Sequence, residues 1–339
     1  MTTSTTRRPL LRLPKAHLHV HLEGAMRFTT LRELSDRCGV PVARPGGPFG
    51  TFAAFQQLYL AARGVLRSLE DMARLVEEVV EDAATDGAIW IEISVNPQEH
   101  RHLAPPDVVL SALIAAGASA GAVNGVGVGW LITADRTCSV DLAMEQALLA
   151  ARFAGEGVVS FGLANDEAAA PPEPFRQAFA VARSAGLLSA PHGGEHRGPE
   201  SVEGAVGALG AHRVQHGVRA IEDSTLVTRL ADHGICLDVC PTSNVLLSVV
   251  SDVESHPLPH LVSAGVACSI NADDPLLFGV GLLDEYELCR SRLGLDDSVL
   301  AGCARSSIAH SGAPERVKSR GIDGIALWLR DELEDSNPT

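Results

Sequence analysis

Short apolar runs recur along the chain and are separated by segments in which apolar positions return every three or four residues. The short runs have the length of buried strands, and the segments between them have the periodicity of amphipathic helices. Residues 69–85 are typical of the second kind, because Met72, Leu75 and Val79 would share one face and Gly87 follows the end. Eight strands are predicted, at residues 16–21, 88–95, 126–133, 158–163, 187–192, 213–216, 235–240 and 266–271.

Strands that alternate with helices form a parallel sheet, and eight of them close most simply into a (β/α)8 TIM barrel, the α/β fold that we expect. The longest stretch without a strand, residues 28–87, follows the first strand and contains a Pro/Gly-rich segment at 44–50, so we expect it to cover the barrel mouth as a lid. A closing helix is expected at 325–333. We expect one domain over residues 1–339, with flexible ends at 1–12 and 334–339.

The balance of charge excludes two classes of partner. The 339 residues include 27 basic and 42 acidic side chains, for a net charge of −15, and the basic residues are scattered. Proteins that bind nucleic acid or anionic membranes need clustered positive charge to displace counterions. We therefore expect a small-molecule partner, with no nucleic acid and no membrane.

One long uncharged stretch needs its own explanation. Residues 108–134 carry no charge over 27 positions and include a GxxxG series, as some membrane-spanning helices do. The turn signal at Asn124-Gly125 instead divides the stretch into a helix at 106–120 and a strand at 126–133. The start of the chain has no secretory signal, and the seven cysteines form no CxxC pair, so we expect a reduced, cytoplasmic protein.

Polar residues gather where four of the predicted strands end. In a parallel barrel the carboxyl ends of the strands meet at one mouth, so these residues would come together in space. Because side chains alternate along a strand, His17, His19 and His21 would all point into the barrel. Histidines and a carboxylate from separate strands make a zinc site that leaves one position for water. The four segments are His17-Leu-His-Val-His-Leu-Glu-Gly24, His192-Gly-Gly-Glu195, His216-Gly217 and Asn271-Ala-Asp-Asp-Pro275.

At these residues the sequence resembles the adenosine deaminase family, and the resemblance spans nearly the whole chain. It implies a metal-dependent deaminase with one zinc ion, bound by His19, His21, His192 and Asp273. Two further segments, 97–100 and 256–259, look more like the adenine deaminase and aminodeoxyfutalosine deaminase branches of the family. The segments that carry the resemblance are 14–25 for the opening strand, 192–195 for the HAGE motif, 213–217 for the R-I-G-H-G motif and 273–275 for the TDDP motif.

The resemblance also implies catalytic roles around the metal. Glu195 would protonate N1 of the purine, His216 would orient the attacking water, and Asp274 would meet the imidazole side of the substrate. The chemistry accounts for these residue types independently. Replacing an aromatic amino group by oxygen needs a strong nucleophile, and zinc lowers the pKa of water from 15.7 to about 7. Attack at C6 moves electrons onto N1, where a carboxylic acid kept protonated can supply the proton.

Substrate contacts are the least determined part of the sequence. The resemblance places Glu23, Asn165 and the backbone of Gly194 at the substrate, but the family usually has aspartate in place of Glu23 and glycine in place of Asn165. A side chain at residue 165 occupies space or adds hydrogen bonds. We expect a 6-aminopurine nucleoside, adenosine or a 5′-modified relative such as 6-aminodeoxyfutalosine. The alternatives are an adenine deaminase that acts on the free base and a barrel that binds a purine without turnover.

Other metal sites fit the sequence less well. His21-Leu-Glu23 matches half of the nucleobase-deaminase zinc signature, but the PCxxC half is absent. A binuclear amidohydrolase would carry a modified lysine on a middle strand, and the two lysines, Lys15 and Lys318, lie elsewhere, which indicates one metal ion. We expect His17 to lie behind the metal or in the core. Surface positions are expected for the loop histidines His100, His102, His196, His256 and His260.

Overall fold

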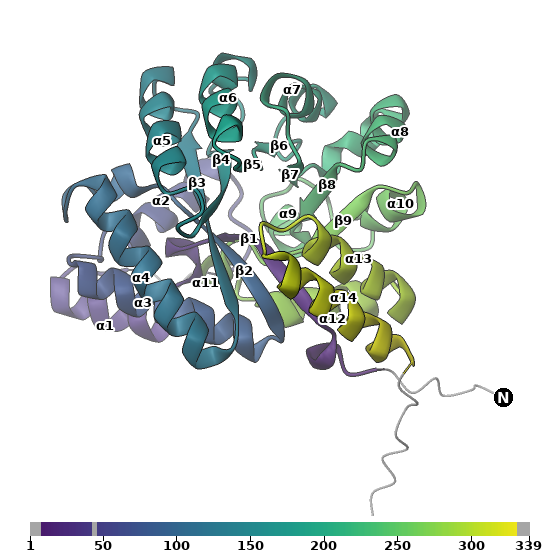
Figure 1. Cartoon of the computed structure of the whole chain (residues 1–339), viewed down its shortest axis with the longest axis horizontal. Coiled ribbons are helices and arrows are strands. Elements are labelled where there is room, and N and C mark those ends of the chain that lie inside the picture. Colours follow the sequence, from purple (N-terminus) through teal and green to yellow (C-terminus); the bar gives the residue numbers. More distant parts are fainter. Residues whose placement is uncertain (1–7, 43–45, 331–339) are drawn as a thin grey trace, which may run out of the picture.

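The computed structural model describes residues 8–42 and 46–330 (Figure 1). Its strands pair in parallel in two sheets, of order β1-β2-β3-β4-β5 and β6-β7-β8-β9, with helices around the outside. The strands are β1 (Lys15–His21), β2 (Ala88–Val95), β3 (Gly127–Asp135), β4 (Val158–Ala164), β5 (Leu188–Ser189), β6 (His192–Gly193), β7 (Arg213–His216), β8 (Cys236–Val239) and β9 (Ala267–Ile270).

Two seams join these sheets into a barrel. At one seam the chain passes almost directly from β5 into β6. At the other, Val20 of β1 pairs in parallel with Asp273, just after β9. The amide of His21 donates to the carbonyl of Asp273 at 3.0 Å, and the amide of Asp273 donates to the carbonyl of His19 at 3.0 Å. The predicted α/β TIM barrel is confirmed, and the second seam also brings the first and last motifs together.

The predicted strands agree with the observed ones within two residues, except for the fifth. Residues 187–192 form two short strands, β5 and β6, because Pro191 has no N–H to donate between them. The carbonyl of Pro191 still accepts from the amide of Gln215 at 2.9 Å, so this segment stays in the barrel wall.

Along the chain, helices lie between most of the strands, and in space they lie around the outside of the barrel. The predicted helices at 69–85 and 106–120 correspond to α3 and α4, and the closing helix corresponds to the end of α14 as far as Arg330, with residues 331–333 outside the described residues. The α-helices are α1 (Phe28–Cys38), α2 (Phe52–Arg63), α3 (Leu69–Thr85), α4 (Pro106–Asn124), α5 (Val140–Arg152), α6 (Arg176–Ser184), α7 (Pro199–Leu209), α8 (Ser224–Asp232), α9 (Pro241–Leu246), α10 (Leu258–Ser263), α11 (Pro275–Phe278), α12 (Leu282–Ser291), α13 (Asp297–Ala309) and α14 (Glu315–Arg330). The 3-10 helices are η1 (Leu10–Arg12), η2 (Glu23–Ala25), η3 (Pro97–His100), η4 (Glu173–Phe175) and η5 (Val218–Glu222).

The long uncharged stretch is a helix followed by a strand, as expected. Helix α4 is long and apolar enough to cross a membrane by length and composition, and 33% of its most apolar window is buried. It packs against α3 and β3, and its side chains Val109, Leu110 and Leu113 are buried there. The stretch is therefore divided between one outer helix and one barrel strand.

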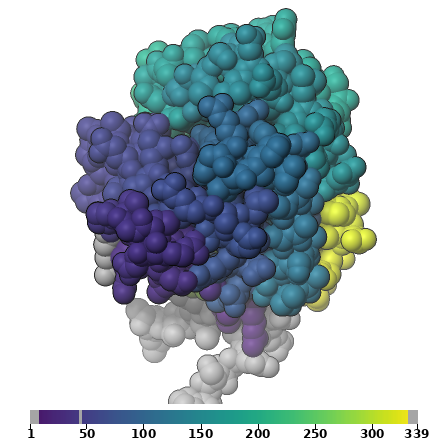
Figure 2. Space-filling model, turned by 90° about the vertical axis from the view of Figure 1, so that its left-hand side faces the viewer, coloured from purple at the N-terminus to yellow at the C-terminus, as the bar shows by residue number. Residues whose placement is uncertain are grey.

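Helix α2 provides the lid expected after the first strand. It lies beside η2 and α11, and the Phe55 ring stacks on Phe278 with centroids 5.6 Å apart. Part of the Pro/Gly-rich segment, residues 43–45, lies outside the described residues. Figure 2 shows the face on which the N-terminal helices, coloured purple to blue, lie together below the teal middle part of the chain.

A buried ion network crosses the lower part of the barrel. Arg213 of β7 donates to Glu92 of β2 at 2.7 Å and lies 3.0 Å from the carboxylate of Asp238 on β8, and all three side chains are inaccessible to solvent. Glu92 also accepts from Ser160 of β4 at 2.8 Å. Arg213 therefore links strands from both sheets. Its role is structural, and the barrel mouth remains available for the residues that carry chemistry.

Candidate active site

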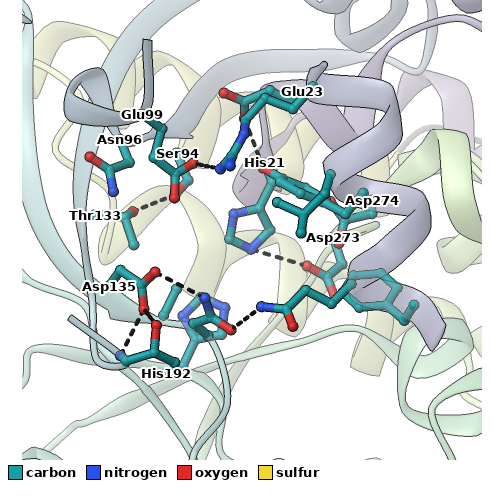
Figure 3. Close-up of a pocket in the computed structure, with 18 of the residues that line it drawn as sticks. His21, Glu23, Ser94, Asn96, Glu99, Thr133, Asp135, His192, Asp273 and Asp274 are labelled. Carbon is teal, nitrogen blue, oxygen red and sulfur yellow. Dashed lines mark hydrogen bonds and ion pairs between the residues drawn. The ribbon is translucent and has the colours of Figure 1, made fainter. Parts of the chain in front are cut away.

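The four predicted metal ligands come together at the carboxyl ends of the strands. The Nε2 atoms of His19 and His21, both on β1, lie 3.2 and 3.4 Å from Oδ1 of Asp273. The ring of His192, on β6, has its centroid 4.8 Å from that of His19 and 5.3 Å from that of His21. Figure 3 shows His21, His192 and Asp273 on the floor of a pocket. We call His19, His21, His192 and Asp273 the metal cluster.

The hydrogen bonds of two of these histidines leave the Nε2 atom free for a metal. Nδ1 of His19 lies 3.2 Å from the carbonyl of Asp238, and Nδ1 of His192 lies 3.0 Å from the carbonyl of Leu163. A carbonyl can only accept, so each Nδ1 carries a proton and Nε2 is the nitrogen left to face a metal. Nε2 of His19 is buried without a hydrogen-bond partner. Metal-binding histidines are typically held in this way by their other nitrogen.

Asp273 is held as a charged carboxylate. Burial would raise its pKa, but the adjoining histidines, first His19, outweigh burial and hold the pKa of Asp273 well below its usual range. Its Oδ2 accepts a hydrogen bond from Ser243 at 2.7 Å, which leaves Oδ1 facing His19 and His21. Asp273 has a φ of 61°, a conformation that non-glycine residues rarely adopt and that is often found at functional sites.

His216 lies beside the cluster, and its hydrogen bonds suit another role. It could form a second set of ligands with His19 and His192. However, its Nδ1 lies 3.2 Å from the amide nitrogen of Asn244, which donates, so the proton of a neutral His216 is on Nε2. That Nε2 lies 3.6 Å from Glu195 and 3.9 Å from Asp273. His216 is therefore arranged to donate a hydrogen bond rather than to bind a metal.

Two buried acids next to the cluster are arranged to hold protons. Burial, followed by the charge of Asp273, raises the pKa of Glu195 well above its usual range, and the same two causes raise that of Asp274. Oδ1 of Asp274 is buried without a partner. Gly24 lies directly against it, since a Cβ at that position would be 1.6 Å from this oxygen. Only glycine leaves room for the Asp274 carboxyl group.

The cluster opens into a cavity of about 220 Å³ between the barrel mouth and α2. The inner end is formed by His21, His192, His216 and the acids that follow β6 and β9. The outer end is rich in hydrogen-bonding groups, and aromatic side chains of α2 cover one side. The lining residues are His21, Glu23, Phe52, Phe55, Gln56, Tyr59, Leu60, Arg63, Ser94, Val95, Asn96, Glu99, Thr133, Ala134, Asp135, Thr137, Ala164, Asn165, His192, Glu195, His216, Leu247, Asp273 and Asp274.

Glu23 lines this cavity and is fixed from two directions. Its Oε1 is bonded to Nε2 of His100, and its Oε2 accepts from the hydroxyl of Tyr59 at 2.7 Å. Burial would raise the pKa of Glu23, but the bond to His100 outweighs it and lowers the pKa to about 2. Glu23 therefore presents a fixed negative charge toward a ligand. His100 is fully buried, so the expectation of a surface position for it is wrong.

Asn165 connects the lid to the barrel. Its Oδ1 accepts from the side-chain amide of Gln56 on α2 at 3.0 Å, and its own amide donates to Asp135 at 3.0 Å. Asn165 has a φ of 80°, which asparagine tolerates better than most residues. The side chain that replaces the family's glycine thus adds hydrogen bonds, one of the two outcomes expected for it.

Gly194 has a different role from the one expected, because it lies outside the cavity lining and its amide donates to Oε1 of Glu167 at 2.9 Å. The expected substrate contact from its backbone is therefore not supported. Oε2 of Glu167 accepts from the next three amides, those of Glu195, His196 and Arg197, at 2.9, 2.6 and 2.9 Å. The buried carboxylate of Glu167 thus fastens the loop that carries Glu195.

His17 also departs from the expected orientation. The pairing of β1 with β2 slips by one residue between His17 and Val20, so the strict alternation of side chains is broken there. Both residues line a second cavity outside the barrel mouth, and Nε2 of His17 accepts from the amide of Ala272 at 3.1 Å. His17 thus lies behind the metal cluster, as expected, but does not point into the barrel with His19 and His21.

Several residues around the site had no expected role. Ser243 and Asn244 follow β8 and contact Asp273 and His216, and Asn244 also bonds to His256 at 3.1 Å. His256 is buried, contrary to expectation. Their place after a strand was a usable signal, since the other site residues occupy the same position on their strands. Of the remaining loop histidines, His102 and His260 are exposed, whereas His196 is partly buried next to Glu195.

Comparison with known proteins agrees with this geometry. A family model described as adenosine deaminase matches residues 14–328. A putative adenosine/adenine deaminase of Streptomyces coelicolor is 44% identical, with 95% of this chain and 98% of the relative covered. An aminodeoxyfutalosine deaminase of Streptomyces avermitilis is 36% identical over 94% of this chain and 92% of its own. An adenine deaminase of Chelativorans sp. is 35% identical over 91% of this chain and 96% of its own.

Solved structures agree as well. The crystal structure of an adenine deaminase from Arthrobacter aurescens superposes with a TM-score of 0.86 at 29% identity, with 94% of this chain and 99% of that one covered. An amidohydrolase from Burkholderia ambifaria with bound zinc has a TM-score of 0.85 at 26% identity, with 97% and 95% covered.

Proposed function

The chain belongs to the adenosine deaminase family, and we propose that it deaminates a 6-aminopurine nucleoside, adenosine or a 5′-modified relative such as 6-aminodeoxyfutalosine. Its relatives are named deaminases, so the chain is a hydrolase of C–N bonds that acts on adenine, adenosine or aminodeoxyfutalosine. In the proposed reaction water replaces the 6-amino group, and the products are the 6-oxo nucleoside and ammonia. The seven free cysteine thiols suit the cytoplasmic location that we propose with it.

The metal cluster suits a single zinc ion. Three histidines and one aspartate are a ligand set that zinc accepts, and Nε2 of the buried His19 lies 3.2 Å from Oδ1 of Asp273 within this set. We propose that His19, His21, His192 and Asp273 hold this ion. Bound there, zinc would lower the pKa of a water molecule toward neutrality and so provide the nucleophile.

Glu195 is the proposed proton donor. Addition of water at C6 moves an electron pair onto N1 of the purine, so this nitrogen needs a proton at the same stage. Burial, followed by the charge of Asp273, raises the pKa of Glu195 and so favours the protonated carboxyl group, and Glu167 holds the loop that positions it. General acids placed in this way contribute about 10²- to 10⁴-fold to a rate.

His216 and Asp274 have two further roles, at other atoms of the substrate than N1. Nε2–H of His216 points toward Glu195 and Asp273, where it can donate to the oxygen that adds at C6. The raised pKa of Asp274 keeps its carboxyl group protonated, so it can donate to N7, which only accepts. Together they fix the purine ring over the metal cluster.

One observation carries the choice of a nucleoside. Beyond the residues needed for the ring, the cavity continues into an outer end lined by Gln56, Asn96, Asp135, Thr137 and Asn165, all of which form hydrogen bonds. These side chains already bond to one another, as Asn165 does to Gln56 and Asp135. Ribose hydroxyls both donate and accept, so they can add hydrogen bonds to this network, and a free base has no hydroxyls with which to do so. The cavity therefore suits a substrate larger than the base.

Adenine is the second candidate, and the fixed charge of Glu23 favours it. A carboxylate that points at the five-membered ring can accept from N9–H, a donor that the free base has and the nucleoside lacks. Two of the similar proteins are named adenine deaminases. A barrel that binds a purine without turnover is disfavoured, because a binder would not need an acid with a raised pKa at Glu195.

A panel of substrates tests the proposal. The zinc-loaded protein would be assayed spectrophotometrically with adenine, adenosine, deoxyadenosine, 5′-substituted adenosines and aminodeoxyfutalosine. We expect kcat/KM for the best nucleoside to exceed that for adenine by about tenfold or more, which corresponds to one or two additional ribose contacts. If adenine alone were turned over, the substrate would be the free base and the nucleoside proposal would be wrong.

A further inference from the structure

The outer end of the cavity carries a strongly negative set of side chains. Three carboxylates line it, from Glu23 on η2, Glu99 on η3 and Asp135 at the end of β3. Among the lining residues of the described chain, Arg63 is the single arginine or lysine. Figure 3 shows Glu23, Glu99 and Asp135 on the side of the pocket away from Asp273.

The guanidinium of Arg63 is already engaged. It forms an ion pair and a hydrogen bond with Glu99, from Nη1 to Oε2, and both side chains are about one quarter exposed. Arg63 comes from the last turn of α2, and Glu99 comes from η3 on the opposite wall. The pair therefore bridges the lid and the barrel across the outer end of the cavity. Glu99 neutralises the positive charge of Arg63 there.

Within residues 8–42 and 46–330, no other arginine or lysine lines this space. His21 lies at the inner end, in the metal cluster. His100 is outside the cavity lining, and its Nε2 is bonded to Oε1 of Glu23. The carboxylates lie close together: burial raises the pKa of Glu99, and the charges of Glu23 and Asp135 raise it further.

A negatively charged ligand group would meet repulsion at this end. A phosphate or carboxylate carried on the 5′ side of a nucleoside would enter the space between Glu23, Glu99 and Asp135, where the described lining residues offer no free cation. Like charges brought together in a water-poor cleft are strongly disfavoured, and proteins use this repulsion for selectivity. An uncharged ribose or a bare base meets no such penalty.

We propose that Glu99, by holding Arg63, makes the cavity select uncharged 6-aminopurines and reject those that carry a phosphate or carboxylate on the 5′ side. This inference rests on the proposed function and narrows it to adenosine, deoxyadenosine and uncharged 5′ derivatives. It removes 6-aminodeoxyfutalosine, whose 5′ substituent ends in a carboxylate, and it leaves adenine, the second candidate, allowed. Glu99 is thus a specificity residue that acts through Arg63, and its removal releases a guanidinium toward the substrate.

The matched pair adenosine and AMP tests the proposal in the zinc-loaded protein. The wild type should prefer adenosine over AMP by about 100-fold or more in kcat/KM, a discrimination of the size that unpaired buried charges produce. In Glu99→Gln the freed Arg63 can pair with the phosphate, and the ratio of AMP to adenosine turnover should rise about tenfold or more. The double variant Glu99→Gln/Arg63→Gln should lose that gain.

A remote substitution controls for overall charge. Glu145→Gln on the exposed face of α5 removes the same charge far from the cavity and should leave the ratio at the wild-type value. A wild-type kcat/KM for AMP within about tenfold of that for adenosine would overturn the proposal. So would a ratio of AMP to adenosine turnover that is the same in Glu99→Gln and Glu145→Gln.

Binding separates this inference from the proposed function. Calorimetry of the zinc-loaded wild type with inosine and IMP needs no turnover, and inosine should bind about 30-fold more tightly or better. If no purine is deaminated but this binding preference holds, the proposed function fails and the charge selection stands. Equal binding of inosine and IMP, with adenosine turned over, would leave the function intact and overturn the selection. Circular dichroism and thermal melting would show that each variant is folded before its ratio is used.

Discussion

The carboxylate of Glu167, just after β4, accepts the backbone amide of Glu195 at 2.9 Å across 28 residues of sequence. The same carboxylate accepts four further donors, three backbone amides and the hydroxyl of Ser201 at 2.5 Å. From the end of β3, Arg136 donates to the carbonyl of His192 at 2.7 Å. Two buried charged side chains thus hold the segment that provides both a metal ligand and the proposed acid.

Glu167→Gln should reduce catalysis more than substrate binding. The amide of glutamine keeps one acceptor but turns an NH₂ group toward backbone donors, so the loop of Glu195 should shift. We expect kcat to fall by about tenfold or more with KM changed less, and stability to fall by about 2 kcal/mol because buried donors lose their acceptor. Glu203→Gln, at an exposed position on α7, is the matched control and should have the kcat and the stability of the wild type. An unchanged kcat in Glu167→Gln would show that the loop does not need this carboxylate.

Glu195→Gln should abolish deamination and keep the fold. We expect a loss of about 10²- to 10⁴-fold in kcat with a normal zinc content and melting temperature. Because the protonated form of Glu195 is active and its pKa is raised by burial, wild-type kcat should decline as pH rises through that pKa. The residual rate of Glu195→Gln should lack this alkaline decline. Substantial activity in the variant would remove Glu195 from the mechanism.

Two histidine variants distinguish the metal ligands from their neighbour. His21→Ala should lower the zinc content of the purified protein, because it removes a ligand. His216→Ala should keep one zinc per chain and still lose activity, because Nε2–H of His216 donates and does not bind the metal. Measurement of the zinc content of both purified variants would show which histidine binds the metal. Loss of zinc in His216→Ala with retention in His21→Ala would favour the alternative set of His19, His192 and His216.

The buried Glu285 of α12 should make the protein less stable as pH rises. Burial raises its pKa from 4.5 to about 8, and both carboxylate oxygens accept from the amide of Thr242. Between these two values the unfolded chain releases a proton that the folded chain retains, so stability should fall by up to about 1.4 kcal/mol per pH unit. Glu285→Gln should flatten this decline in melting temperature between pH 5 and pH 8.

Glu287→Gln, an exposed position on the same helix, is the control for the pH experiment and should keep the wild-type slope. A Glu285→Gln variant whose melting temperature follows the wild-type curve would contradict the assignment of the slope to Glu285.

Local patterns in the sequence predicted most of the barrel. Apolar runs mark buried strands and helical periodicity marks the helices between them, and both are properties of short segments. The meeting of the segments that contain His19, His21, His192 and Asp273 followed from one rule, that the carboxyl ends of parallel strands share a mouth. The choice of these four residues as ligands came from the resemblance to the adenosine deaminase family. The break in the fifth strand at Pro191 was missed, because residues 187–192 were expected to form one strand although proline cannot donate to a ladder.

Features that depend on contacts between distant segments were missed. The slip in β1 that turns His17 away from His19 arises from its register with β2, which the strand itself does not encode. The bonds from His100 and Tyr59 to Glu23 span 77 and 36 residues, so no local pattern indicated that His100 would be buried. The use of the Gly194 amide by Glu167 likewise depends on how two loops meet.

A zinc titration of metal-free protein, with ammonia release from adenosine as the readout, tests the central claim most directly. The protein would be stripped with a strong chelator and returned to activity by stepwise addition of zinc. We predict no turnover without metal and a linear rise that ends at one zinc per chain, the stoichiometry of the cluster of His19, His21, His192 and Asp273. Turnover by the stripped protein, or a rise that continues to two zinc ions per chain, would contradict a deaminase that works with a single zinc ion.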